Sequence, residues 1–336
     1  MTFAARTTTN VCSCCTAIIV LAATLAASCG DDDTDGHSSH RADASVADAN
    51  TPAVAGKSYR IQIEVKDVPP GTEGTKCMKV SLGNASPIKV GRVHNQLFGQ
   101  SHHFIVSSVT DAAATAEGLY DCTPFRAPLT GAPLTITQKH DEQITLPHGV
   151  GYALGADQLM HLELHYINTT SETADVRAES ELFVLDDDTD IQEAGFLIAG
   201  SMDIAIPPHS SHTTGDVYLA APEALSGVHY YAITGHTHQF GKNVKVSVAE
   251  DAKADGTTIY ELSSFDWSAP EVRYFDPPIE VPSGGGFRFS CDWDNPTDQT
   301  VKYGESAMSE MCFFWAYYYP KSPKQQTLIY MPQRTM

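Results

Sequence analysis

The sequence predicts an all-β fold made of two tandem β-sandwiches. Almost no stretch after residue 50 has the apolar spacing of an amphipathic helix, whereas Val, Ile, Thr and Tyr recur in short alternating runs. The 24 glycines and 19 prolines supply turn signals between these runs. With 336 residues the chain is longer than one typical domain of roughly 100–200 residues. Many short strands in two series are typical of two sandwiches or jelly rolls.

Residues 1–28 have the features of a secretory signal peptide. Arg6 precedes an apolar run at 16–27 that is too short to span a bilayer. The run leads into Ser28 and Cys29, a junction that resembles a bacterial lipoprotein signal with Cys29 as the lipidated residue. Ordinary cleavage beside the same small residues, which would leave a soluble secreted protein, is the alternative. We therefore predict an exported protein that a lipid anchors to the membrane, on the periplasmic or outer-surface side of a bacterial envelope.

Residues 29–56 predict a disordered acidic tether that follows the lipidated cysteine. They contain the run Asp31-Asp32-Asp33, scattered Ser, Ala and Asp, and no aromatic residue. Such a segment cannot bury enough apolar surface to fold.

The charge of the chain excludes one class of partner. Asp and Glu number 41 against 21 Lys and Arg, which gives a formal net charge of −20. This charge repels phosphate backbones, so nucleic acid is not expected to bind. No feature of the sequence indicates a protein partner.

An acidic break divides two series of predicted strands. Four of the five residues at 186–190 are Asp. We expect an N-terminal domain at 57–190 and a C-terminal domain at 191–336. The predicted strands are 59–65, 77–81, 101–109, 158–166 and 174–184 before the break, and 193–198, 215–219, 228–235, 242–248, 257–262, 287–291 and 311–319 after it.

Four of the eight cysteines remain once the signal peptide and Cys29 are set aside. An even number in an exported protein indicates two disulfides, and four cysteines allow three pairings. Sequence order favours one bridge in each domain, Cys77 with Cys122 and Cys291 with Cys312.

The motif His236-Thr237-His238 follows a predicted strand directly. Residues two apart in extended backbone project to the same face, so both imidazoles can reach one metal ion. A pair of solvated loop histidines is the alternative.

Two further histidine groups lie in the N-terminal half. His102 and His103 are adjacent, and neighbours in a regular strand point to opposite faces, so shared ligation needs a backbone irregularity. His161, Glu163 and His165 alternate with apolar residues and share one strand face, which is either solvated or part of a site.

Met311 and Cys312 open a segment so aromatic that we expect it to be buried. A methionine is usually core filler. A disulfide from Cys312 to Cys291 would hold the start of this strand and fix the thioether in place. Thioether together with imidazole selects a soft ion, copper above all.

In this order the motifs resemble the copper type II, ascorbate-dependent monooxygenases, the family of peptidylglycine α-hydroxylating monooxygenase and dopamine β-monooxygenase. The resemblance covers residues 57–325. It implies two tandem jelly-roll domains with one copper site in each, separated by an open cleft, and it agrees with the two disulfides favoured above. The implied ligands are His102, His103 and His165 for the first copper, and His236, His238 and Met311 for the second.

The resemblance also implies a reaction. The second copper would bind and activate O2, and a C–H bond of a small-molecule substrate would be hydroxylated. The first copper would store and pass an electron, and ascorbate or an equivalent would reduce both ions. Glu163 is a candidate for orienting the ring of His165, although a solvated Glu is equally compatible.

The sequence departs from the peptide-amidating branch where that branch binds its substrate carboxylate. An Arg two residues before the His-x-His pair is replaced by Thr234, and polar residues after the Met are replaced by Phe313 and Trp315. Phe313 and Trp315 share the strand face of Met311. We expect a substrate pocket that takes an apolar or aromatic molecule, the alternative being that these rings fill the core.

Two other functional classes compete with a monooxygenase. A non-catalytic copper-binding surface lipoprotein would fill both sites without turnover. A zinc hydrolase would use three histidines, but it leaves Met311 unexplained and provides no convincing general base.

Overall fold

The computed structural model describes residues 54–111, 113–125, 132–186, 188–324 and 326–330. Over these ranges the chain forms strands and one 3-10 turn, η1 (Glu223–Leu225), without an α-helix, which confirms the predicted all-β class. No helix in this part of the chain is long and apolar enough to cross a bilayer. The predicted signal peptide, Cys29 and the predicted tether up to residue 53 lie outside the described residues.

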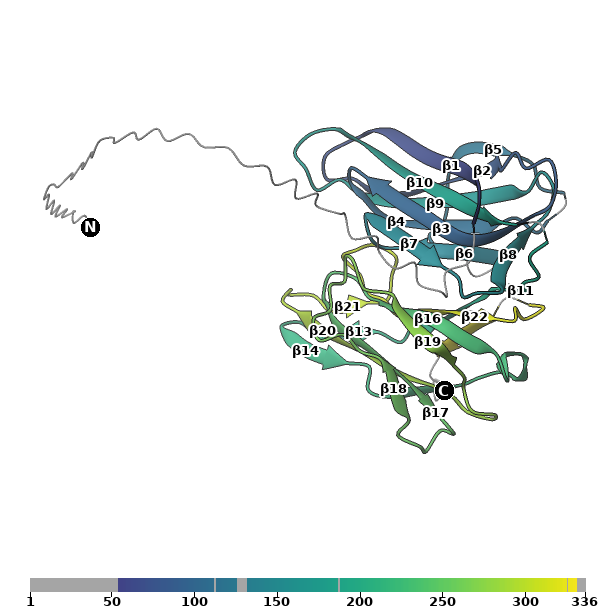
Figure 1. Cartoon of the computed structure of the whole chain (residues 1–336). Coiled ribbons are helices and arrows are strands. Elements are labelled where there is room, and N and C mark those ends of the chain that lie inside the picture. The colour runs from purple at the N-terminus through teal and green to yellow at the C-terminus, as the bar shows by residue number, and fades with distance from the viewer. Residues whose placement is uncertain (1–53, 112, 126–131, 187, 325, 331–336) are drawn as a thin grey trace, which may run out of the picture. The chain divides into compact units, whose positions relative to one another are not determined.

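Strands that precede residue 190 form two facing sheets (Figure 1). The two sheets pack on each other through a shared apolar core. Apart from one short parallel pairing, their strands are antiparallel. The first sheet has the order β1 (Val54–Val68), β10 (Ala174–Leu185), β3 (Ile88–Phe98), β8 (Val150–Leu154) and β11 (Gln192–Glu193), with β7 (Asp141–Thr145) also on β3. The second has the order β5 (Glu117–Asp121), β2 (Glu73–Ser81), β9 (Leu159–Ile167), β4 (Ser101–Ser108) and β6 (Ala132–Thr137).

Strands after residue 190 form three further sheets. A two-stranded sheet pairs β13 (Ala205–Ile206) with β21 (Val301–Lys302). One five-stranded sheet has the order β19 (Arg273–Ile279), β16 (His229–His236), β22 (Cys312–Tyr319), β12 (Gly195–Ser201) and β23 (Gln326–Tyr330). The other has the order β14 (Ser210–Thr213), β20 (Gly286–Asn295), β17 (Gly241–Ala249) and β18 (Thr257–Tyr260), with β15 (Val217–Ala220) also on β20.

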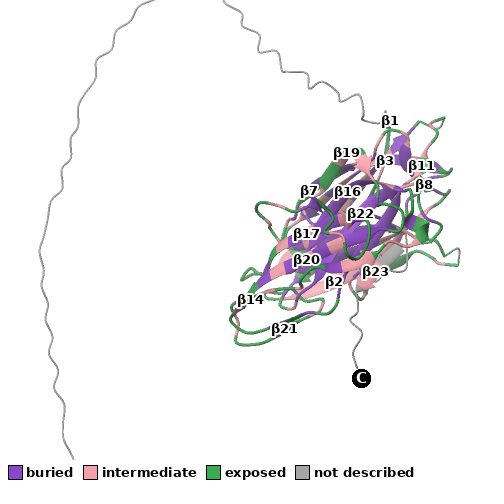
Figure 2. Ribbon diagram, turned by 90° about the horizontal axis from the view of Figure 1, so that it is seen from below, coloured by how far each residue is buried: buried purple, intermediate pink, exposed green. Residues whose placement is uncertain are grey.

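Strand β22 is buried on both faces (Figure 2). Phe313, Trp315 and Tyr317 pack into the core that the first two sheets share. Phe314 and Tyr318, on the opposite face, pack into the core formed with β17 and β20. Strand β22 has aromatic residues on both faces because both faces are covered, as expected for a central strand.

Both predicted disulfides are present and confirm the favoured pairing. Cys77 is bonded to Cys122 and Cys291 to Cys312. Disulfides form and persist outside the reducing cytosol, so they indicate export.

The domain boundary near residue 190 stays a proposal. The sheets before and after it are separate except that β11, just past the boundary, pairs with β8. β1 begins at Val54, so its backbone pairs with β10 three residues before the predicted start of the folded region. Several strands were not predicted, the longest being β3, in which Asn95 is buried and bonds Thr135 and Thr137.

Candidate metal centres

His102 and His103 reach the same place because β4 contains a bulge. Between Ser101 and His103 the strand advances two residues while its partner β9 advances one, from Tyr166 to His165. Such a bulge re-aims a side chain that regular pleating would turn to the other face. The His102 ring centroid lies 5.5 Å from that of His103 and 5.3 Å from that of His165. The irregularity that the adjacent pair requires is thus built into the strand.

The tautomer of His165 is fixed by Glu73, at the start of β2. His165 Nε2 lies 3.0 Å from Glu73 Oε1, and an ionised carboxylate only accepts, so Nε2 carries the proton. The lone pair of His165 is then on Nδ1, which lies 3.1 Å from His103 Nε2. Two nitrogens bound to one tetrahedral ion at about 2.0 Å are separated by roughly 3.3 Å. The spacing of this pair suits a hydrogen bond or a shared metal ion.

Burial keeps the rings of His102 and His103 neutral. Desolvation lowers the pKa of His102 to about 3 and that of His103 well below its usual value. A neutral imidazole has the lone pair that a metal needs. His103 also has a buried Nδ1 without a hydrogen-bond partner. Within the three-histidine set (His102, His103 and His165), His102 and His103 therefore offer uncharged nitrogen donors.

The second set lies where β16 ends and β22 begins. The rings of His236 and His238 are 5.2 Å apart between centroids. His236 Nδ1 donates to Gln138 Oε1 over 2.6 Å, which leaves its buried Nε2 without a partner. His238 Nδ1 donates to the carbonyl of Ser309 over 3.1 Å and likewise leaves Nε2 for a metal. Desolvation lowers the pKa of His238 to about 4 and that of His236 well below its usual value.

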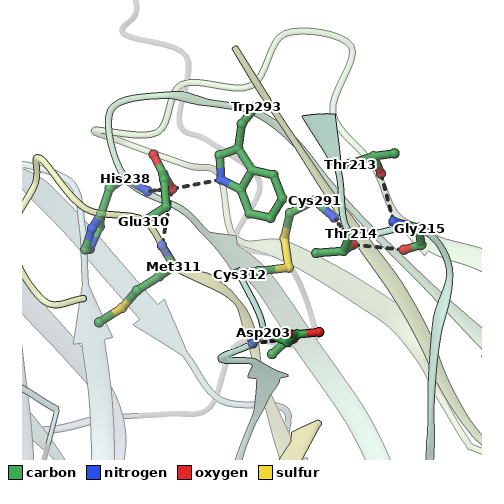
Figure 3. The surroundings of a disulfide bond; sticks show 11 residues. Asp203, Thr213, Thr214, Gly215, His238, Cys291, Trp293, Glu310, Met311 and Cys312 are labelled. Atoms are coloured by element: carbon green, nitrogen blue, oxygen red, sulfur yellow. Dashed lines mark hydrogen bonds between the residues drawn. A yellow bond between two sulfur atoms is a disulfide. The ribbon is translucent and has the colours of Figure 1, made fainter. Parts of the chain in front are cut away.

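Glu310 holds the two ligand segments of the second set together (Figure 3). Its buried carboxylate accepts the backbone N–H groups of His238 at 2.9 Å, Phe240 at 2.8 Å and Met311 at 3.2 Å. It also accepts the indole N–H of Trp293 at 2.8 Å. Burial raises the pKa of Glu310 to about 7 against the effect of these donors. The carboxylate therefore anchors the backbone on either side of the His236–His238–Met311 set.

Met311 is fixed by its neighbours in sequence. Cys312, the next residue, is bonded to Cys291 on β20, and Glu310, the preceding one, has the hydrogen bonds just described. In Figure 3 the thioether of Met311 and the ring of His238 extend to the same side of Glu310. The expectation that this disulfide pins the start of the strand is consistent with that arrangement.

The two sets lie next to each other. The rings of His103 and His236 are 6.3 Å apart between centroids. The ring of Phe125 lies against both, with its centroid 4.9 Å from that of His103 and 5.5 Å from that of His236. The two sets are thus in ring contact, closer than the open cleft implied by the resemblance.

As the side chains stand, no three His, Cys, Asp or Glu residues within the described ranges are arranged to hold a metal ion. His103 and His165 are hydrogen bonded to each other. The sulfur of Met311 is a thioether donor, which is not one of these four residue types. The donor chemistry nevertheless fits copper. Neutral imidazoles with buried, unpartnered nitrogens beside a thioether are a soft ligand set.

An apolar cavity of about 90 Å³ adjoins the second set. His236 and Met311 line it together with Phe313 and Trp315, two members of the predicted pocket. The third predicted member, Thr234, is not among the lining residues. Its hydroxyl donates to the carbonyl of Glu271 at 3.0 Å. The described residues that line the cavity include no Asp, Glu, Lys or Arg.

Sequence comparison links part of the chain to a known family. The family model for the copper type II ascorbate-dependent monooxygenase, C-terminal domain, matches residues 192–335. The C-terminal part of the chain is thus similar to the copper type II, ascorbate-dependent monooxygenases, the family that the motifs resemble. Human DBH-like monooxygenase protein 1 is 27% identical over 54% of this chain and 32% of its own length. Dopamine beta-hydroxylase of Rattus norvegicus is 25% identical over 54% of this chain and 30% of its own length.

The matched region spans a third to a half of the curated relatives. A putative human DBH-like monooxygenase protein 2 is 21% identical over 66% of this chain and 47% of its own length. Among solved structures, the major capsid protein P2 of bacteriophage PM2 aligns with 77% of this chain and 97% of its own at 10% identity, with a TM-score of 0.34. A structural likeness of that size carries no functional information.

Sequence reasoning missed the residues that orient the ligands. Glu73 and Gln138 lie 92 and 98 residues away from the histidines that they bind, so no local motif marks them. Glu163, the candidate for orienting His165, instead accepts the backbone N–H of Phe125 at 2.7 Å. Only Glu310 had a local signal, because it directly precedes Met311.

Proposed function

We propose that the chain is a copper monooxygenase that uses O2 and ascorbate, or an equivalent reductant, to hydroxylate a C–H bond of a small apolar or aromatic molecule. One observation carries the proposal: two donor sets meet beside an apolar cavity that reaches His236 and Met311. The similarity of residues 192–335 to the C-terminal domain of the copper type II monooxygenases supports it.

The proposal assigns one copper ion to each donor set. Copper, when bound, supplies the one-electron chemistry that activates O2. His236, His238 and Met311 would hold an ion at the end of the cavity, where the thioether favours the reduced state. The three-histidine set would hold the ion that provides a second electron, because imidazoles tolerate both oxidation states.

The protein's own part in the reaction is to place the substrate and to exclude water. Phe313 and Trp315 present aromatic surface beside His236, so an apolar substrate gains contact area when water leaves the cavity. A dopamine-like ammonium group would find no carboxylate among the described lining residues, and a peptide carboxylate would find no cation. Charged substrates are therefore disfavoured.

Copper stoichiometry and oxygen uptake test this function on the same samples. The purified chain should bind about two copper ions and consume O2 with ascorbate in the presence of a substrate. Met311→Ala and His165→Ala should each weaken one site and abolish substrate-dependent uptake. Copper binding without uptake across a broad panel of apolar compounds would favour a copper-binding surface lipoprotein, and no copper binding would refute both.

We also propose that a lipid on Cys29 anchors the exported protein to a bacterial envelope membrane. The junction at residues 28–29 supports this, and the two disulfides are consistent with an oxidising compartment. Mass spectrometry should find a lipidated Cys29 at the mature N-terminus. Cys29→Ser should release the protein into the soluble fraction, and a wild type that is already soluble would contradict the anchor.

A further inference from the structure

The carboxylate of Glu73 is hydrogen bonded to His165 of the three-histidine set and also to the segment that precedes Met311. Its Oε1 accepts Nε2–H of His165 at 3.0 Å and the backbone N–H of Ala307 at 2.8 Å. Its Oε2 accepts the hydroxyl of Ser306 at 2.7 Å. His165 belongs to the three-histidine set, whereas Ser306 and Ala307 lie in the segment that leads into Met311. One carboxylate thus connects strand β2 and a ligand of the first set to the segment that precedes the second.

The connection continues through Ser306 to the second set. The carbonyl of Ser306 accepts the backbone N–H and the hydroxyl of Ser309, at 2.9 and 2.7 Å. The carbonyl of Ser309 in turn accepts Nδ1–H of His238. A continuous path of hydrogen bonds therefore runs from His165 through Glu73, Ser306 and Ser309 to His238.

The pair of His165 and Glu73 is more buried than an ordinary surface ion pair. The His165 side chain is 4% exposed and that of Glu73 is 26% exposed. Charge-assisted hydrogen bonds in a partly desolvated site hold their partners more firmly than exposed pairs do. A carboxylate on the outer nitrogen of a ligand histidine also raises the basicity of the nitrogen that faces the metal.

We propose that Glu73 is a positioning residue that orients His165 and the segment at 306–311 together, so that copper in one set favours copper in the other. The coupling between the sets rests on the proposed function, whereas the orientation of His165 does not. Ser306 carries the coupling without contacting His165.

The first test uses metal-free protein. In the full chain labelled with 15N at histidine, NMR should find His165 with its proton on Nε2. Glu73→Gln removes the charge that selects this tautomer, so its population should fall. Ser306→Ala leaves the bond between Glu73 and His165 in place and should leave the tautomer unchanged. Glu181→Gln is the matched control, because Glu181 also accepts two side-chain hydrogen bonds. One comes from the hydroxyl of Ser58 and the other from the guanidinium of Arg60.

The second test adds copper to the same variants. Calorimetry with electron paramagnetic resonance should show Glu73→Gln binding copper about 10–100-fold more weakly at the three-histidine set, with an altered spectrum. Ser306→Ala should retain the spectrum of that site. In this variant the ratio of the affinity for the second copper ion to the affinity for the first should fall severalfold. Glu181→Gln should match the wild type in both.

The outcomes separate the two proposals. Unchanged tautomer, affinity and spectrum in Glu73→Gln would overturn the role of Glu73. Independent binding of the two ions in the wild type would overturn the coupling. A wild type that binds no copper, but whose His165 tautomer depends on Glu73, would refute the proposed function and support the orientation of His165.

Discussion

The two donor sets are built in different ways from the same kind of fold. The three-histidine set arises inside a sheet, from a bulge in β4, and the ring of His165 is hydrogen bonded to His103 and to Glu73. The second set lies at strand ends and is anchored by the buried carboxylate of Glu310 and by the bond between Cys291 and Cys312. The comparison suggests that the second set is rigid before metal binds, whereas the first has to exchange one internal hydrogen bond for a metal.

Removing Glu310 should have the largest effect. Glu310→Ala leaves three backbone N–H groups and the Trp293 indole without their acceptor. Because each unsatisfied buried donor costs roughly 1–3 kcal/mol, we expect the free energy of unfolding to fall by about 4 kcal/mol or more. Denaturant unfolding measures this. Glu261→Ala, which removes a half-exposed carboxylate paired with Lys245, should cost less than about 1 kcal/mol. Equal losses in the two variants would mean that Glu310 anchors nothing.

Removing each disulfide distinguishes general stability from the rigidity of one set. The pairs close loops with sequence separations of 21 residues for Cys291–Cys312 and 45 residues for Cys77–Cys122. Loop entropy predicts losses of about 3 and about 4 kcal/mol respectively when both cysteines of a pair are replaced by Ala. Only loss of Cys291–Cys312 should also weaken copper at the set that contains Met311, as seen by calorimetry. If both double variants lose copper equally, the bridge next to Met311 has no special role.

The candidate ligands could be proposed from the sequence because their signals are local. His236 and His238 share a face by their spacing alone, and Met311 is marked by the adjoining Cys312. The adjacent histidines were less certain, because the bulge that brings His102 and His103 together depends on pairing with β9.

Residues that act across the fold gave no such signal. β3 was missed because its polar residues include Asn95, which is tolerated in the core only through bonds to Thr135 and Thr137. Thr234 was assigned to the pocket because it stands where the peptide-amidating branch has an Arg, and its hydroxyl donates a hydrogen bond to the carbonyl of Glu271. A resemblance gives the position of a residue in the sequence, but the packing of other segments decides what its side chain contacts.

Gln138 provides a smaller and more local test of the second set. Gln138→Ala removes the acceptor that fixes the tautomer of His236, so copper affinity at this set should fall by about 10–100-fold. The free energy of unfolding should fall by roughly 1–3 kcal/mol, because one buried donor loses its acceptor. Gln138→Glu supplies an acceptor again and should recover much of the affinity. Calorimetric copper titration measures both, with Gln96→Ala as control, since the side chain of Gln96 donates a hydrogen bond to Asp141 at the surface. Failure of the Glu variant to recover binding would mean that Gln138 acts by packing.

The ring of Phe125, which both sets contact, lies next to a carboxyl group whose effect on stability depends on pH. Phe125 lies against His103 and His236, and Glu163 accepts its backbone N–H. Burial raises the pKa of Glu163 to about 8, from an ordinary value of 4.5. Between these values the folded state keeps a proton that the unfolded state has lost. Stability from this group is therefore complete below about pH 4.5 and falls by about 1.4 kcal/mol per pH unit up to about pH 8.

Glu163→Gln isolates this contribution because the amide cannot ionise. The free energy of unfolding of the variant, minus that of the wild type, should rise steadily between about pH 5.5 and pH 7.5. Denaturant titrations at several pH values measure the difference, in which all other titrating groups cancel. A difference that does not change with pH would show that Glu163 is already ionised in the folded protein. A cation or water next to the carboxylate of Glu163 would then have to stabilise the charge.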